Sequence, residues 1–141
     1  MLDESGSVGT ADFGLLKYFL SQIVDRLDID SSNTRVGVVT FSSKVGNTID
    51  LNAHLSVARL QSAIMSLSYT AGTTNTAAAL AYVRTKMLTA AAGDRTNVPN
   101  VVIVLTDGAS DNVADTQVRM NIICHSLWAG TPSRCTKQPP R

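Results

Sequence analysis

The first segment of this sequence that could do chemistry is Asp3-Glu4-Ser5-Gly6-Ser7, where a carboxylate and two hydroxyls occupy alternate positions. In an extended segment alternate side chains point the same way, so Asp3, Ser5 and Ser7 are expected to converge on one point. Hard divalent cations prefer such oxygen ligands, usually with few carboxylates and with water completing the coordination. A Ser-Gly-Ser segment by itself is also typical of a simple turn.

Two later segments supply further oxygen atoms. Asp107 follows a predicted buried strand, and Thr74 lies at the start of a predicted helix. In an α/β sheet, ligands sit beyond the carboxyl ends of the strands, so both side chains are expected at the edge that holds the first segment. Thr74 could instead be a helix N-cap, and Asp107-Gly108 could be an ordinary turn. The predicted metal ligands are Asp3, Ser5, Ser7, Thr74 and Asp107.

Helices and strands that alternate along the chain must position these ligands. Hydrophobic periodicity predicts, in order, a helix over 11–27, strands over 35–41 and 45–51, helices over 57–67 and 75–92, a strand over 100–106 and a helix over 115–127. The alternation predicts an α/β fold in which helices cover both faces of a doubly wound, mostly parallel sheet. The more polar strand over 45–51 is expected at the sheet edge.

Composition excludes several classes of function. Twelve Lys and Arg against eleven Asp and Glu give a net charge of +1, which offers no basic surface for nucleic acid. The longest apolar run, Val101 to Leu105, falls far short of the ~20 residues that a membrane-spanning helix needs. The sequence contains no phosphate-binding loop and no nucleophile elbow, so we expect no enzyme. Cys124 and Cys135 indicate neither a zinc site nor a disulfide scaffold, and their pairing is left open.

Taken together, the oxygen-bearing segments resemble the von Willebrand factor type A family, also called the integrin inserted-domain fold. The metal-ion-dependent adhesion motif of that family is Asp-x-Ser-x-Ser, then a distant Thr and a distant Asp. The positions that match it, in order, are Asp3, Ser5, Ser7, Thr74 and Asp107. The resemblance runs from Leu2 to about Val118 and implies a Rossmann-like fold of the collagen and matrilin type.

The resemblance also implies a division of roles among the ligands. Ser5 and Ser7 would bind the cation directly, Thr74 directly or through water, and Asp3 and Asp107 often through water. The implied cation is Mg²⁺ or Mn²⁺, with Ca²⁺ less suited. An open coordination position would accept a Glu or Asp carboxylate from a partner, which the family implies is an extracellular-matrix protein. A cation held mainly by neutral hydroxyls keeps residual positive charge, and that charge favours an incoming anion.

Two further carboxylates lie close to the motif. Glu4 and Asp111 match no ligand position of the family, and both are expected on the solvated surface. Because neighbouring side chains of an extended segment point in opposite directions, Glu4 should face away from Asp3 and Ser5.

The ends of the sequence depart from the family pattern. Only Met1 and Leu2 precede the motif, where the family has an apolar central strand. The expected organisation is a partial A domain over 1–118, without the central first strand and the C-terminal strands, and a divergent helix with a disordered tail over 119–141. The function expected is cation-dependent protein binding. A non-functional or poorly folded fragment, or an intracellular A domain of a multi-protein assembly, are the alternatives. The family is extracellular, but the sequence shows no signal peptide.

Overall fold

A small mixed sheet forms the centre of the structure, a computed structural model that describes the backbone of residues 1–127 and the side chains of residues 1–120. Its strands, in the order β1-β2-β3, are β1 (Leu2–Asp3), β2 (Val38–Phe41) and β3 (Val45–Ile49). β1 pairs with β2 in parallel, and β3 pairs with β2 antiparallel. On its other side β1 forms one parallel bridge, between Leu2 and Leu105. The central strand, which the sequence was expected to lack, is thus represented by the two residues of β1.

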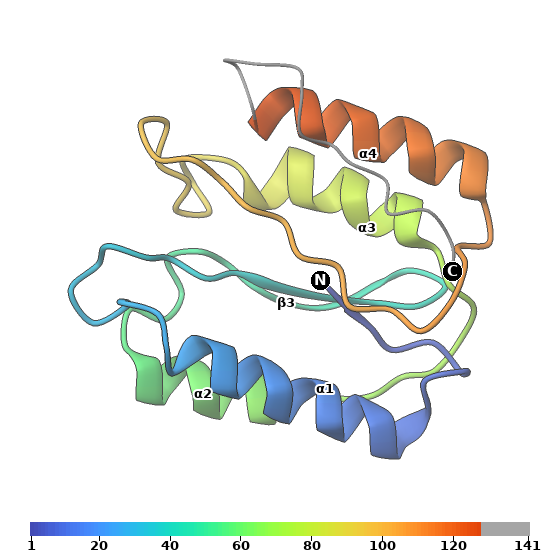
Figure 1. Ribbon diagram of the computed structural model, residues 1–141, viewed down its shortest axis with the longest axis horizontal. Helices are drawn as coiled ribbons and strands as arrows, with labels where there is room; N and C mark the ends of the chain where they lie inside the picture. Colours follow the sequence, from blue (N-terminus) through green and yellow to red (C-terminus); the bar gives the residue numbers. More distant parts are fainter. Residues whose placement is uncertain (128–141) are drawn as a thin grey trace.

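Helices cover both faces of this sheet (Figure 1). One layer consists of α1 (Gly9–Val24) and α2 (Val57–Met65), which contact each other. The other layer consists of α3 (Thr76–Tyr82), its continuation as the π-helical turn η1 (Val83–Met87), and α4 (Val113–Leu127). The predicted α/β architecture with helices on both faces is confirmed. Its sheet is smaller than predicted, with one parallel and one antiparallel strand pair.

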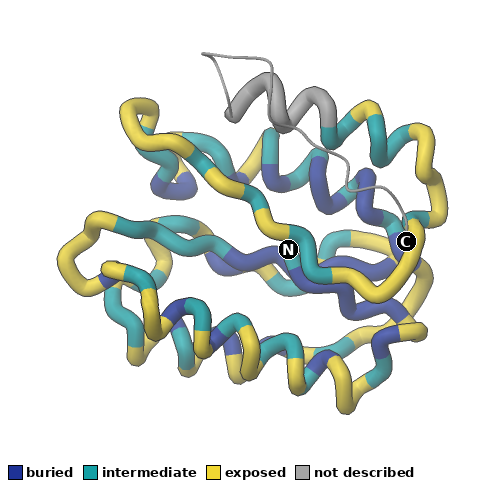
Figure 2. Tube along the Cα trace, viewed as in Figure 1, coloured by how far each residue is buried: buried dark blue, intermediate teal, exposed yellow. Residues whose placement is uncertain are grey.

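The core has two parts because β2 is buried on both faces (Figure 2). Val38 packs into a cluster that includes Leu60 and Ile64 of α2, whereas Val39 packs against Val83 and Met87 of η1. Adjacent residues of a strand point to opposite faces, so one short run of valines reaches both helix layers. Such continuous apolar strands are typical of sheets covered on both sides.

The predicted strand over 100–106 is wrong for all but one of its residues. Only Leu105 forms a bridge, and residues 101–104 have no strand conformation. Backbone bonds reach this segment from residues 1–3: the Met1 amine donates to the Ile103 carbonyl at 2.8 Å, and the Leu105 N–H donates to the Met1 carbonyl at 3.0 Å. A strand needs a hydrogen-bonded partner along its whole length. Residues 1–3 pair only with the last few residues of the segment over 100–106, so the rest of that segment forms no strand.

Other predicted boundaries moved by a few residues, as expected for frayed helix ends. The first helix begins at Gly9 and ends at Val24, rather than running over 11–27. The predicted boundary at residue 118 falls inside α4 and stays a prediction. The predicted disordered tail beyond residue 127 lies outside the described residues, and a pairing of Cys124 with Cys135 concerns side chains that are likewise outside them. Within the described range, no helix has both the length and the apolar character to cross a membrane.

In the 141-residue chain, the terminal amine of Met1 should make the free energy of unfolding depend on pH. Burial lowers the pKa of this amine from 8.0 to about 6. The unfolded chain therefore binds more protons between these pH values, and the free energy of unfolding should rise as the pH increases through this window. The expected gain is about 1–2 kcal/mol, because Met1 keeps some contact with solvent.

Urea unfolding in EDTA, at about pH 5.5 and about pH 8.5, measures this gain. A chain acetylated at its N-terminus is the control, since its amine no longer titrates, and the difference between the two chains isolates the contribution of Met1. The same pH dependence with and without acetylation would contradict the expectation.

Candidate metal centre

Asp3 is fixed at the end of β1 and is fully buried. Its N–H donates to the Leu105 carbonyl at 2.9 Å, so strand pairing sets its position. Its Oδ1 accepts the Ser5 N–H at 2.8 Å, and its Oδ2 accepts the Thr106 hydroxyl at 2.6 Å. Both carboxylate oxygens thus already accept a hydrogen bond. This arrangement suits a residue that orients the loop and reaches a cation through water.

Ser5, Ser7 and Asp107 form a continuous chain of oxygen atoms. The Ser5 and Ser7 hydroxyl oxygens lie 3.1 Å apart, and the Ser7 hydroxyl donates to Asp107 Oδ1, also at 3.1 Å. Neighbouring ligands of an octahedral Mg²⁺, with bonds of about 2.1 Å, are separated by about 3.0 Å. Both separations match that spacing. Ser5 is buried, whereas Ser7 and Asp107 are exposed, so the oxygen chain opens to solvent.

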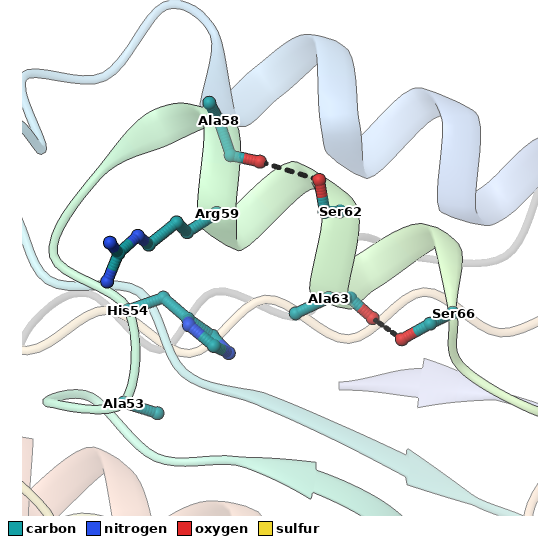
Figure 3. A pocket seen from close by; sticks show the side chains of 7 residues that line it. All are labelled: Ala53, His54, Ala58, Arg59, Ser62, Ala63 and Ser66. Carbon is teal, nitrogen blue, oxygen red and sulfur yellow. Dashed lines mark hydrogen bonds between the residues drawn. The ribbon is translucent and has the colours of Figure 1, made fainter.

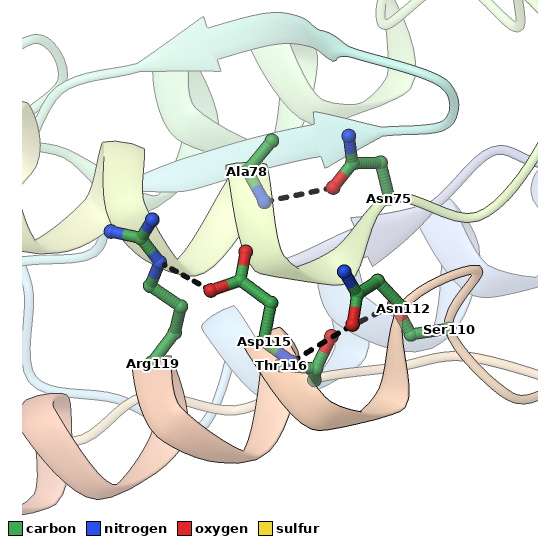
Figure 4. Close-up of polar contacts among 7 residues, drawn as sticks. All are labelled: Asn75, Ala78, Ser110, Asn112, Asp115, Thr116 and Arg119. Carbon is green, nitrogen blue, oxygen red and sulfur yellow. Dashed lines mark hydrogen bonds and ion pairs between the residues drawn. The ribbon is translucent and has the colours of Figure 1, made fainter.

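Thr74 is held in place by its backbone, and its hydroxyl makes no hydrogen bond to another described residue. Its N–H donates to Asp111 Oδ1 at 3.1 Å, and its carbonyl accepts the Asp111 N–H at 2.8 Å. The cap of α3 is the next residue, Asn75, whose Oδ1 accepts the Ala78 N–H at 3.0 Å (Figure 4). The alternative of Thr74 as an N-cap is therefore wrong, and its hydroxyl stays available to a ligand.

A backbone contact joins the loop of Thr74 to the loop of the two serines. The Gly6 N–H donates to the Gly72 carbonyl at 2.8 Å. Gly72 has φ +126°, and a Cβ there would lie 2.6 Å from the Ser43 hydroxyl, so only glycine fits this approach. The structure therefore links Asp3, Ser5, Ser7 and Asp107 by direct hydrogen bonds and brings the loop of Thr74 against them.

The loop that carries Asp111 is anchored in turn to the start of α4 (Figure 4). The Ser110 and Thr116 hydroxyls lie 2.8 Å apart, and the Asp115 N–H donates to Asn112 Oδ1 at 2.9 Å. Asp111 is exposed, as predicted, yet it is also the residue that positions Thr74. No local sequence pattern signals that role, because the contacts join two loops that are distant in the sequence.

The prediction for Glu4 is wrong, since its side chain is fully buried. Its Oε1 accepts the Thr40 hydroxyl at 3.0 Å, and its Oε2 has no hydrogen-bond partner among the described residues. A Cβ on Gly46 would lie 2.1 Å from Oε1, which shows how closely β3 covers this carboxylate. Glu4 does point away from the metal ligands. Because helices cover both faces of the sheet, that direction leads into the protein rather than into water.

Two other contacts with the metal segments were not foreseen. The Thr106 hydroxyl binds Asp3, and the Tyr69 hydroxyl donates to the Ser5 carbonyl at 3.0 Å. Thr106 directly precedes Asp107 at the end of an apolar run, so its position beside the site could have been inferred from the sequence. No local pattern marks Tyr69, which reaches the site from the loop after α2.

A hollow along α2, away from the motif loops, has no carboxylate in its lining and is not a candidate cation site (Figure 3). His54 and Arg59 are its titratable side chains. The hydroxyls of Ser62 and Ser66 donate to carbonyls of their own helix, at 2.9 and 2.8 Å. Across the described residues, no group of three or more His, Cys, Asp or Glu side chains could hold a metal ion. A candidate cation site among the described residues must therefore use hydroxyl oxygens, such as those of Ser5, Ser7 and Thr74.

Comparison with known proteins identifies the family of this chain. A model of the von Willebrand factor type A domain matches residues 1–124. The chain belongs to the von Willebrand factor type A family. The resemblance inferred from the sequence and the Rossmann-like α/β fold are both confirmed.

The relatives of this A domain include matrix proteins. Matrilin-1 of Bos taurus is 38% identical over 123 residues, which cover 84% of this chain and 23% of matrilin-1. The collagen alpha-4(VI) chain of Mus musculus is 34% identical over 118 residues, which cover 82% of this chain and 5% of the collagen chain. The chain thus spans less than a quarter of these relatives.

A solved relative carries a metal. Proximal thread matrix protein 1 from the mussel byssus, in a structure with a zinc-occupied MIDAS motif, aligns with this A domain at a TM-score of 0.77 and 27% identity. The alignment covers 91% of this chain and 34% of the mussel chain. Divalent-cation binding is therefore known for a relative in this family.

The bond from Thr106 to Asp3 should stabilise the A domain even without a cation. Thr106→Val removes the hydroxyl that Asp3 accepts and should lower the free energy of unfolding by about 1–2 kcal/mol, because hydrogen bonds to charged groups contribute this much. Thr106→Ser keeps the hydroxyl and is the matched control. Urea unfolding in EDTA gives the comparison, and equal losses for the two variants would show that the bond contributes nothing.

Proposed function

We propose that this A domain is a non-enzymatic protein-binding module that uses a divalent cation, Mg²⁺ or Mn²⁺, to bind a carboxylate of an extracellular-matrix protein. The oxygen chain of Ser5, Ser7 and Asp107 is the observation that carries the proposal. Its two separations of 3.1 Å suit adjacent ligands of a small cation. Thr74, from the neighbouring loop, would add a further hydroxyl.

The electrostatics of the candidate site favour an acidic partner. Asp3 already accepts a hydrogen bond on each carboxylate oxygen, which leaves Asp107 as the carboxylate best placed for direct contact. Hydroxyl ligands carry no charge, so one carboxylate would balance only part of the charge of a divalent cation. When bound, the cation supplies a positively charged open position that a Glu or Asp side chain of a partner can fill.

The position of the site supports binding to a protein rather than to a small molecule in a deep pocket. Ser7 and Asp107 are exposed, and Gly6 between the serines is exposed as well. The buried residues Asp3 and Ser5 form the base of the site. An acidic side chain that protrudes from a partner protein can reach the exposed residues Ser7 and Asp107. The matrix proteins among the relatives support a partner in the extracellular matrix.

The first test measures cation binding by the chain alone. Titration with Mg²⁺ or Mn²⁺, followed by calorimetry or by the electron paramagnetic resonance of Mn²⁺, should show weak, saturable binding. Asp107→Ala should lower the affinity by at least about tenfold, equivalent to about 1.4 kcal/mol. Asp50→Ala, which removes an exposed carboxylate outside the site, is the matched control. Equal uptake of Mn²⁺ by the wild type and Asp107→Ala would eliminate the site.

The second test measures partner binding. The folded chain is passed over a panel of immobilised matrix proteins in a surface-resonance assay. Binding should disappear in EDTA and return with Mg²⁺ or Mn²⁺, and less completely with Ca²⁺, which prefers more and longer oxygen contacts. Ser7→Ala should weaken binding, while Ser62→Ala, an exposed serine on α2, should not. Binding that survives EDTA, or a folded chain that binds no panel member, would defeat the proposal.

A further inference from the structure

The loop that carries Asp107 holds the only position in the sequence where an Asp or Asn is followed by glycine. In an Asp-Gly pair the glycine nitrogen can approach the preceding carboxyl group closely, because no Cβ obstructs it. Thr106, Asp107, Gly108 and Ala109 are all exposed, and none of them lies in a helix or a strand. Exposed segments of this kind change conformation more readily than the elements that they connect. This loop therefore combines a reactive pair with room to move.

Few contacts hold the two residues of the pair. Among the described residues, the Asp107 carboxylate accepts one hydrogen bond, from the Ser7 hydroxyl at 3.1 Å. The Gly108 N–H donates to the Thr106 hydroxyl at 3.3 Å, which is longer than an ordinary N–H···O bond. A Cβ at Gly108 would meet no neighbouring segment within 4 Å. Once the bond from Ser7 opens, nothing in the described part of the chain keeps the carboxyl group from the Gly108 nitrogen.

We propose that Asp107 is a site of spontaneous modification, where the chain converts Asp107 to isoaspartate through a succinimide. The Gly108 nitrogen attacks Cγ of Asp107 and forms a C–N bond, while the nitrogen loses its proton and one carboxyl oxygen leaves as water. Water then adds to the ring at the former main-chain carbonyl, and the original bond between the two residues breaks. The product has the same atoms as the starting chain, so water is the only reagent.

The rearrangement removes a ligand from the candidate metal centre. The main chain of the product runs through the former side chain of Asp107 and is longer by one carbon, while the free carboxylate is attached directly to Cα. The remaining side-chain oxygen becomes an amide carbonyl, so Ser7 no longer faces a carboxylate at 3.1 Å. The added carbon also displaces the loop in which Asp111 positions Thr74. Cation affinity should therefore fall in the modified chain.

Asp107 should react more slowly when it coordinates a cation, and this part of the inference rests on the proposed function. A coordinated carboxylate is held in place, so its Cγ cannot reach the Gly108 nitrogen. The reaction then proceeds from the cation-free fraction of the chain, which falls as the cation concentration rises above Kd. Modification would accumulate in chains that have lost their cation.

The first experiment uses the full chain without any cation. The chain is incubated in EDTA at neutral pH and body temperature for several weeks, and isoaspartate is located by mass spectrometry of the tryptic peptide over 96–119. Isoaspartate should accumulate at Asp107 and not at Asp111 or Asp115 of the same peptide, nor at the exposed Asp50. A level at Asp107 no higher than at these residues would overturn the proposal.

Gly108→Ala is the matched variant, because Gly108 has no positive φ and its surroundings leave room for a Cβ. The variant should melt like the wild type and keep the Asp107 carboxylate, yet its isoaspartate at this position should fall to the level found at Asp50. Ser7→Ala, which releases the carboxylate, should react faster than the wild type. Equal rates in the wild type and Gly108→Ala would refute attack by the Gly108 nitrogen.

Two further measurements separate the modification from the proposed function. At a free Mg²⁺ concentration ten times Kd, isoaspartate should form about tenfold more slowly at Asp107. The purified isoaspartate form should lose at least about tenfold in cation affinity. If the fresh chain binds no cation, the proposed function fails, whereas isoaspartate at Asp107 in EDTA still supports the modification site. If the fresh chain binds Mg²⁺ and Asp107 reacts at the same rate with and without it, protection by the cation is refuted.

Discussion

The pairing of β1 on both of its sides is the constraint on which the structure depends. Leu2 joins β2 through Thr40 and joins the segment before the second metal loop through Leu105. These contacts place Asp3 at the carboxyl end of the strand and bring Asp107, which is a hundred positions away from Ser7, within hydrogen-bond distance of it. Both neighbours of β1 contribute to the two core clusters, with Val38 and Leu105 in one and Val39 and Val102 in the other.

The same constraint limits how many carboxylate oxygens of the candidate site are free to contact a cation directly. Asp3 is committed to two hydrogen bonds that orient the surrounding loops. Backbone contacts, from Gly6 to Gly72 and from Thr74 to Asp111, hold the remaining loops. The carboxylate oxygens of Asp3 and Oδ1 of Asp111 therefore accept hydrogen bonds that hold the loops in place. The hydroxyls of Ser5, Ser7 and Thr74 remain as neutral groups that could contact a cation. A site built in this way is suited to share a cation with an acidic partner.

β1 also divides the sheet into two regions with different chemistry. At its carboxyl end, polar loops meet and expose Ser7 and Asp107. Around Met1, apolar side chains from both helix layers line a hollow of about 470 Å³. The small size of the sheet follows from this arrangement, since the segment over 101–104 has the composition of a strand but no partner along most of its length.

The sequence by itself determined the helices, the α/β class and the oxygen-bearing residues that could serve as ligands, because side-chain periodicity and residue type are local properties. Only the tertiary structure decided that Glu4 is buried, that Thr106 binds Asp3, and that Asp111 positions Thr74. It also decided that residues 101–104 are not a strand. Each of these outcomes depends on which distant segment lies alongside, and neither the pairing of strands nor the burial of a side chain on the second face of a sheet is encoded by neighbouring residues.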